Sequence, residues 1–145
     1  MPVIALTQEM GSLAKDVALK LAEAAGLDVM RHEVQDHVAG KMHVPPSLIR
    51  RIREGKAGLV ERLSTDKQQV ALFSAEEVFA QAEGGNVVLR GWGATCLLRP
   101  VQHVVRVRVT RPFAARVAWL MDHLGTDDRD AAESELRRSD AAHAS

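Results

Sequence analysis

Hydrophobic and polar residues follow one another along this chain with two different periods. Short, mostly apolar runs are typical of strands and occur at residues 3–6, 27–30, 86–90 and 104–109. Between them, apolar residues such as Leu13, Val17 and Leu21 recur at every fourth position, which predicts amphipathic helices. Because strands alternate with long helical segments, we expect an α/β fold in which a parallel sheet of three or four strands is flanked by helices.

The helical segments can be given boundaries from their start and stop residues. They are expected at 12–26, 32–42, 45–63, 74–85, 111–125 and 126–144. Ser74 followed by Glu77 predicts a capping box at the start of the fourth helix. Thr126 is the expected N-cap of the last one. No repeat or linker interrupts the pattern, so residues 1–145 are predicted to form a single domain.

The apolar run at 104–109 differs from the others because arginines alternate with valines. A parallel strand buried on both faces would be continuously apolar. Arg106 and Arg108 therefore predict a strand with one partly wet face, or an edge strand whose charges discourage aggregation.

Composition limits the classes of partner and compartment. Nineteen basic and nineteen acidic residues cancel, and aromatic residues make up 3%, which speaks against nucleic acid as a ligand. No apolar run approaches the roughly 20 residues that span a bilayer, and the N-terminus lacks a basic region typical of a signal peptide. A single cysteine, Cys96, fits a reducing compartment. We expect a cytoplasmic protein that binds neither nucleic acid nor membrane.

The stretch TQEMGSLAKDVALKLAEAAG, residues 7–26, has the order of a phosphate-binding loop: the end of a strand, a turn with glycine, and a helix. Such a loop directs backbone N–H groups and a helix N-terminus at the anion, usually with a lysine nearby. The candidate phosphate-binding residues are Gly11, Ser12, Leu13, Ala14, Lys15 and Asp16.

The full pattern G-x-x-x-x-G-K-[ST] is not met in this loop. Glu9 and Ala14 occupy its two glycine positions, and Asp16 replaces the hydroxyl that would hold magnesium. On the residues alone, a plain strand–turn–helix junction with a solvated Lys15 remains the alternative.

Several segments resemble, in order, those of the cytidylate-kinase-like proteins, a branch of the P-loop nucleoside monophosphate kinases. They are QEMGSLAKDVALKLAE, VMRHEVQDHVAGKM, EGKAGLVERL, VVLRGWGATCLLRPVQHVVRVRV and ELRRSDAAHA. The resemblance covers nearly the whole chain and implies a P-loop kinase fold, ATP with Mg²⁺ as phosphate donor, and a nucleoside monophosphate such as CMP as acceptor. Gln8 and Ala14 depart from the arginine and glycine of the family, so the loop looks degenerate. Family members continue through a further helix and strand, so we expect this chain to be C-terminally short, with its last sheet strand missing.

The resemblance also implies catalytic residues. Lys15 would neutralise charge on the donor phosphates, while Arg116 and Arg138 would clamp the transferring group, since guanidinium groups pair with phosphate oxygens. For the charged helix at 126–144, pairing of Glu133 with Arg137 at i, i+4 is the plainer interpretation of Arg137.

Acceptor contacts are expected at Glu33, Arg90 and Arg99. Arg90 ends a predicted parallel strand, where ligands of α/β proteins bind. The resemblance places RGWG at 90–93 where the family carries DGRD, with Trp92 in place of an arginine. The alternative is that Arg90 and Arg99 cap strand ends while Trp92 packs in the core.

The stretch HEVQDH at 32–37 offers His32 and His37 as metal ligands. Their spacing of five residues places them about 140° apart on a helix, unlike the pair in H-E-x-x-H. Pairs such as His32 with Asp36, or Glu33 with His37, favour a hydrogen-bonding role, so we assign no metal ligands.

Three functions stay open. The leading hypothesis is phosphoryl transfer from ATP to a nucleoside monophosphate. The second is a weak or inactive nucleotide-binding module, and the third a metal hydrolase built on the two histidines. Nucleotides are the expected partners, and dimerisation through an exposed strand is a further alternative.

Overall fold

The computed structural model describes residues 2–53, 58, 61 and 65–142. Its strands are β1 (Val3–Gln8), β2 (Asp28–Val29), β3 (Val87–Arg90) and β4 (Val104–Val109). Its helices are α1 (Ala14–Ala25), α2 (Glu33–Met42), α3 (Pro46–Arg53), α5 (Lys67–Gly84), α6 (Ala94–Leu97), α7 (Phe113–Leu124) and α8 (Arg129–Ala142). Of the helix expected at 45–63, α3 accounts for the part up to Arg53, and most of the remainder lies outside the described residues.

The strands form one parallel sheet in the order β2-β3-β1-β4. Within it β1 is central, because Val3 pairs with Val87 of β3 on one side and with Val104 of β4 on the other. The α/β class with a parallel sheet of four strands is therefore confirmed. Among the described residues β4 has a partner on one side alone, and Arg106 and Arg108 are exposed, as predicted for an edge strand.

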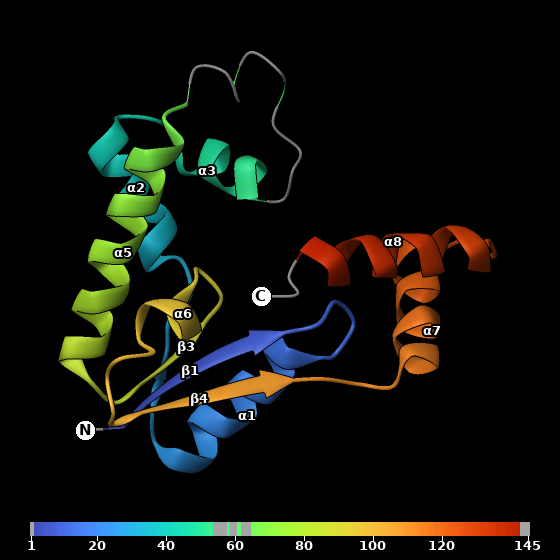
Figure 1. Ribbon diagram of the computed structural model, residues 1–145, viewed down its shortest axis with the longest axis horizontal. Coiled ribbons are helices and arrows are strands. Elements are labelled where there is room, and N and C mark those ends of the chain that lie inside the picture. Colours follow the sequence, from blue (N-terminus) through green and yellow to red (C-terminus); the bar gives the residue numbers. More distant parts are fainter. Residues whose placement is uncertain (1, 54–57, 59–60, 62–64, 143–145) are drawn as a thin grey trace.

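Alternate residues of β1 enter two different hydrophobic clusters. Val3 and Ala5 pack in the cluster shared with α2, α5 and α6, whereas Leu6 packs in the cluster beneath α1. The sheet is thus a middle layer, with α1 on one face and α2, α5 and α6 on the other (Figure 1). This two-sided burial explains the continuous apolar run of β3.

The last two helices lie beyond the carboxyl ends of β1 and β4 rather than on a face of the sheet (Figure 1). They form a third cluster around Val117 of α7 and Leu136 of α8, both fully buried. Met10, from the loop after β1, and Trp119 pack against this cluster. The α7–α8 pair therefore contacts the segment that the sequence identifies as a phosphate loop.

Helix α5 begins earlier than its sequence predicts. The Asp66 carboxylate accepts hydrogen bonds from the N–H groups of Gln68 and Gln69, at 2.9 and 3.2 Å, and so caps the helix. Ser74 lies inside the helix, where its hydroxyl donates to the Val70 carbonyl at 2.6 Å. The predicted capping box at Ser74 is therefore wrong, because Asp66, about two turns upstream, caps the helix.

The N-terminus of α8 is also shifted from its predicted position. Helix α8 begins at Arg129, and the Asp128 carboxylate accepts from the Ala131 N–H at 3.0 Å. The Thr126 hydroxyl instead accepts from the N–H of Asp128 at 3.1 Å. Thr126 thus orders the turn before the helix, and the predicted N-cap is wrong by two residues.

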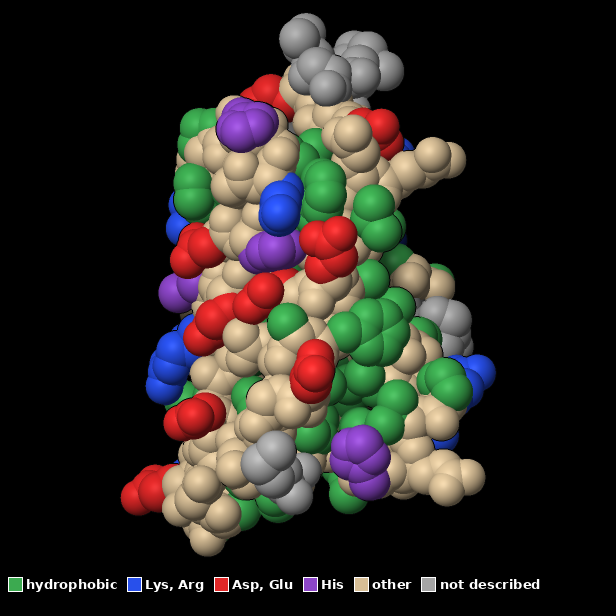
Figure 2. Space-filling view, turned by 90° about the vertical axis from the view of Figure 1, so that its left-hand side faces the viewer, with side chains coloured by type: hydrophobic (Ala, Val, Ile, Leu, Met, Phe, Trp, Pro, Cys, Tyr) green, Lys and Arg blue, Asp and Glu red, His purple; other side chains and the backbone are tan. Residues whose placement is uncertain are grey.

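Helices α2 and α5 pack side by side and share an outer surface rich in histidine and acidic side chains (Figure 2). His37 of α2 lies 3.1 Å from a carboxylate oxygen of Glu76 and 3.6 Å from one of Glu77 on α5. Leu72 and Phe79 are exposed on α5. None of the helices in the described part of the chain combines the length and apolarity needed to cross a bilayer.

Candidate phosphate-binding site

The loop between β1 and α1 turns sharply at the carboxyl edge of the sheet. Gly11 has φ 79° and Leu13 has φ 64°, both in the left-handed region. A Cβ on Gly11 would lie 3.1 Å from Cε3 of Trp119 and 3.2 Å from Cβ of Arg116. Glycine is therefore required at this position by both the backbone conformation and the close approach of α7.

The loop delivers an uncapped helix N-terminus. Leu13 stands at the N-cap of α1 and makes no side-chain hydrogen bond to the first turn. Ser12 is 6% exposed, and its buried hydroxyl has no hydrogen-bond partner among the described residues. An N-terminus in this state presents N–H groups and a positive dipole end, the two features that bind phosphate. Lys15 and Asp16, both exposed, lie in the first turn of the helix.

The two departures from the glycine pattern have different surroundings. The methyl group of Ala14 is buried in the cluster beneath α1, where it packs with Leu6 and Val88. The methyl group therefore faces the core rather than the surface of the loop. Glu9, in contrast, directs its carboxylate at Arg116, with Oε2 at 3.3 Å from Nη2.

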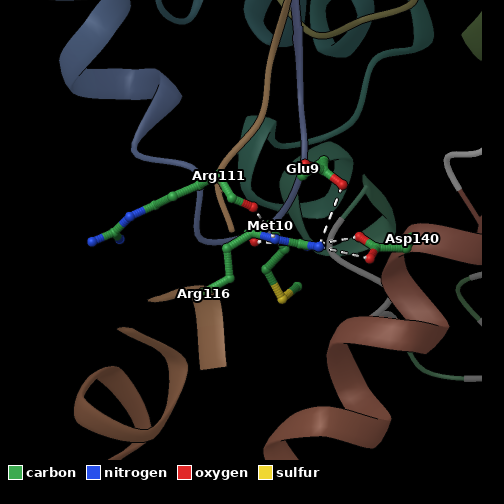
Figure 3. Close-up of polar contacts among 5 residues, drawn as sticks. All are labelled: Glu9, Met10, Arg111, Arg116 and Asp140. Carbon is green, nitrogen blue, oxygen red and sulfur yellow. Dashed lines mark hydrogen bonds and ion pairs between the residues drawn. The ribbon is translucent and has the colours of Figure 1, made fainter. Parts of the chain in front are cut away.

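Arg116 is the centre of a polar network that joins the loop to the last two helices (Figure 3). Its Nη1 and Nη2 donate to the two carboxylate oxygens of Asp140 at 2.9 and 3.1 Å. Its Nε donates to the Arg111 carbonyl at 3.1 Å, and Nη1 approaches the Met10 carbonyl at 3.5 Å. Hydrogen bonding to Asp140 raises the pKa of Arg116 above its ordinary value, and the Glu9 carboxylate adds to this effect. Arg116 is 4% exposed, so its guanidinium is surrounded by the protein groups that accept its hydrogen bonds.

Arg138, the second predicted clamp residue, lies apart from Arg116. Its guanidinium pairs with Glu135 at 2.6 Å, and its side chain is 77% exposed. Asp140, two residues further along α8, faces Arg116. Because each residue of a helix is turned by about 100° from the one before, the side chain of Arg138 leaves α8 on the side opposite to Asp140. The predicted pairing of Glu133 with Arg137 is confirmed, with 3.7 Å between the charged groups.

The three predicted acceptor residues are spread over the sheet. Arg90 ends β3, and its Nη1 donates to Oε1 of Gln8 at 3.1 Å beside the phosphate loop. Arg99 is exposed beyond α6, on the segment that leads to the start of β4 and so toward the opposite edge. Glu33 lines a shallow pocket of about 500 Å³ at the β2 side, together with Asp28 and Val87. Of the three residues, Arg90 is the one that lies next to the loop.

Two contacts near the loop were missed by sequence reasoning. The guanidinium carbon of Arg53 lies 3.8 Å from the ring centroid of Trp92, in the turn that follows β3. Arg111 donates to the Gly11 carbonyl at 3.3 Å. The tryptophan between two glycines was a visible signal, but nothing in the sequence indicates which cation covers it.

The histidines at 32 and 37 do not come together as a ligand pair. His32 precedes α2 at its N-cap, while His37 faces the two glutamates of α5 rather than Glu33. Within the described ranges, no group of three or more His, Cys, Asp or Glu side chains is placed to hold a metal ion.

The parallel sheet, with a glycine turn and a helix after its central strand, has the fold of the P-loop kinases, as comparison with solved structures shows. Shikimate kinase from Bacteroides thetaiotaomicron superposes with a TM-score of 0.65 at 15% identity, covering 99% of this chain and 79% of that chain. Shikimate kinase from Acinetobacter baumannii in complex with shikimate superposes with a TM-score of 0.54 at 12% identity, covering 98% of this chain and 77% of that chain. An uncharacterized protein from Eubacterium ventriosum superposes with a TM-score of 0.67 at 19% identity, covering 98% of this chain and 73% of that chain. At such identities the likeness shows the fold alone.

The family model of the cytidylate kinase-like family matches residues 3–145, and the chain belongs to that family. No curated protein matches it significantly.

Proposed function

We propose that this protein binds ATP at the loop after β1 and transfers its terminal phosphate to a nucleoside monophosphate of the CMP type. The observation that carries the proposal is the uncapped N-terminus of α1, with the buried Ser12 hydroxyl lacking a partner in the described part of the chain. Membership of a kinase-like family and the kinase fold support the same conclusion.

Each loop residue has a distinct part in this proposal. The N–H groups at the start of α1 and the Ser12 hydroxyl hold the donor phosphates, while Lys15 neutralises their charge. The oxygen groups of Ser12 and Asp16 are those that would hold Mg²⁺ beside the phosphates. When bound, this ion offsets the charge that develops on the transferring phosphate.

Arg116 can join the reaction only by exchanging partners. Its donors now face Glu9, Asp140 and two backbone carbonyls, so contact with a phosphate requires release of at least one carboxylate. Arg138, exposed on α8, requires movement of that helix to reach the same group. A clamp of Arg116 and Arg138 therefore belongs to a rearranged state of the α7–α8 pair.

The same network favours a second candidate function, a nucleotide-binding module without turnover. In that case Arg116 keeps its carboxylate partners, and the loop binds phosphate while no arginine reaches the transferring group. The two candidates share the loop and differ in whether ATP is consumed.

Calorimetric titration of Mg-ATP into the wild type, Lys15→Ala and Lys20→Ala tests the shared part. Lys20 is exposed on the same helix, and its replacement changes the net charge equally without touching the first turn. We expect Lys15→Ala to weaken binding at least tenfold and Lys20→Ala to leave it within twofold. Equal affinities of the three proteins would refute the phosphate loop. ATP consumption that rises when CMP is added then separates the kinase from the inactive module.

A further inference from the structure

A groove runs along the outer edge of β2, the strand at one end of the sheet. It consists of two adjoining hollows of about 500 and 340 Å³, which share Asp28, Gln81 and Val87 as lining residues. Its walls come from α1 and α5, which cover opposite faces of the sheet. The wall residues besides Gln81 are Leu19, Ala22, Glu23, Ala80 and Gly84.

The backbone of β2 directs one residue into this groove. The Asp28 N–H donates to the Asn86 carbonyl at 2.9 Å, on the side of β3. The Met30 N–H donates to the Val88 carbonyl at 3.0 Å, on the same side. Because neighbouring residues of a strand direct their backbone groups to opposite sides, the N–H and C=O of Val29 point away from β3. In the part of the chain that the structure describes, β2 has no strand on that side, so these groups face the groove.

The side chains around the groove are apolar on one side and acidic on the other. Val29 packs into the cluster beneath α1, near the partly exposed Leu19. The side chain of Asp28 leaves the strand on the opposite face, toward α5, because neighbouring side chains of a strand alternate. Glu23, Asp28 and Glu33 are exposed lining residues, against one lining cation, Arg31. The groove therefore carries a net negative charge.

We propose that this groove binds an extended segment of a partner protein, in which basic and apolar residues alternate, as an additional strand beside β2. A strand added to a sheet edge gains affinity from main-chain hydrogen bonds and specificity from alternate side chains. Apolar side chains of the segment would face Leu19 and Val29, and its lysines or arginines would face Asp28. The inference goes beyond the proposed kinase function, since the groove uses the second half of α1 and the phosphate loop uses its first turn.

The first test is calorimetric titration of an acetylated and amidated hexapeptide in which lysine and valine alternate. The proteins are the wild type, Asp28→Lys and Asp122→Lys, a control that makes the same charge change on the exposed surface of α7. We expect Asp28→Lys to weaken binding at least tenfold and Asp122→Lys to leave it within twofold. A peptide with glutamate in place of lysine should not bind. Absence of binding to the wild type, or equal affinities of the two variants, would overturn the proposal.

Peptides with methylated amide nitrogens separate strand addition from attraction between charges, with the wild type as the only protein needed. A bound strand directs the N–H groups of every second residue toward β2. Methylation of either the lysine amides or the valine amides should therefore abolish binding, while methylation of the other set preserves it. An equal loss with both peptides would refute the additional strand.

Hydrogen exchange locates the contact on the protein. On peptide binding, exchange of the Val29 amide should slow at least tenfold, while that of the Asp28 amide, already bonded to Asn86, should change by less than twofold. Unchanged exchange at Val29 would contradict the proposal. Sedimentation of the protein without peptide tests a different occupant, because dimers that Asp28→Lys dissociates would mean that a second copy fills the groove and that the proposal is wrong.

Discussion

Arg116 and Asp140 form an ion pair of two parallel hydrogen bonds, at 2.9 and 3.1 Å, that ties α7 to α8 beside the loop between β1 and α1. The pair differs from the surface pairs of α8 because Arg116 is buried, while its partner carboxylate is 30% exposed. Bidentate pairs of this kind fix geometry as well as adding energy. The pair thus adds a polar tie between α8 and the loop to the hydrophobic cluster around Val117 and Leu136.

Asp140→Asn should destabilise the protein by about 1–3 kcal/mol, because it weakens hydrogen bonds to a buried charge that retains Glu9 as a partner. Urea unfolding followed by circular dichroism measures the change as a lower midpoint at constant slope. Asp122→Asn, an exposed change on α7, is the control and should stay within about 0.5 kcal/mol. Equal midpoints for Asp140→Asn and the wild type would show that the pair does not hold α8.

Ala14→Gly should leave Mg-ATP affinity within twofold, although it restores the second glycine of the pattern G-x-x-x-x-G-K-[ST]. The methyl group packs beneath α1 with Leu6 and Val88, away from the N–H groups that face the anion. Loss of this buried methyl, with the added freedom of glycine, should destabilise the protein by about 1 kcal/mol. Calorimetry and urea unfolding on one preparation separate the two effects. An affinity gain of tenfold would mean that the methyl does obstruct the phosphate.

The sequence predicted what depends on local order. The residues from Val87 to Leu89 form the continuous apolar run that is typical of a buried strand. The succession of strand, Gly11 and helix likewise gives the position of the loop from the sequence alone. The alternating arginines of β4 also left an edge strand as one of two alternatives, and the sheet order agrees with it. These features need only neighbours in the chain.

Contacts between distant segments could not be predicted in this way. Arg116 meets Asp140 across 24 residues and Met10 across 106, and no periodic pattern marks such pairs. The cation above Trp92 is one of several arginines in α3, and the sequence offers no means of choosing among them. The start of α5 was predicted wrongly for a different reason. Asp66 and Ser74 are both residues that cap helices well, and only the folded chain shows which of them does so.

Asp66→Ala should therefore destabilise the protein by about 1 kcal/mol, because the N–H groups of Gln68 and Gln69 lose their acceptor. Ser74→Ala, the change that the capping-box pattern marks as damaging, should alter stability by less than about 0.5 kcal/mol. Its hydroxyl donates to the Val70 carbonyl within the helix and caps no N–H group among the described residues. Thermal unfolding of both variants decides between the two caps, and a larger loss in Ser74→Ala would place the start of α5 where the sequence pattern put it.

Leu13→Gly should stabilise the protein or leave its stability unchanged, although it removes a hydrophobic side chain. Leu13 has φ 64°, a conformation that costs a residue with a Cβ about 1–2 kcal/mol, and its side chain is 40% exposed. Relief of this strain offsets the lost contacts and the added freedom of the unfolded chain. Lys20→Gly, in the exposed interior of α1, is the matched control and should destabilise by about 1 kcal/mol. Urea unfolding compares the two variants, and an equal loss in both would show that the left-handed turn at Leu13 is not strained.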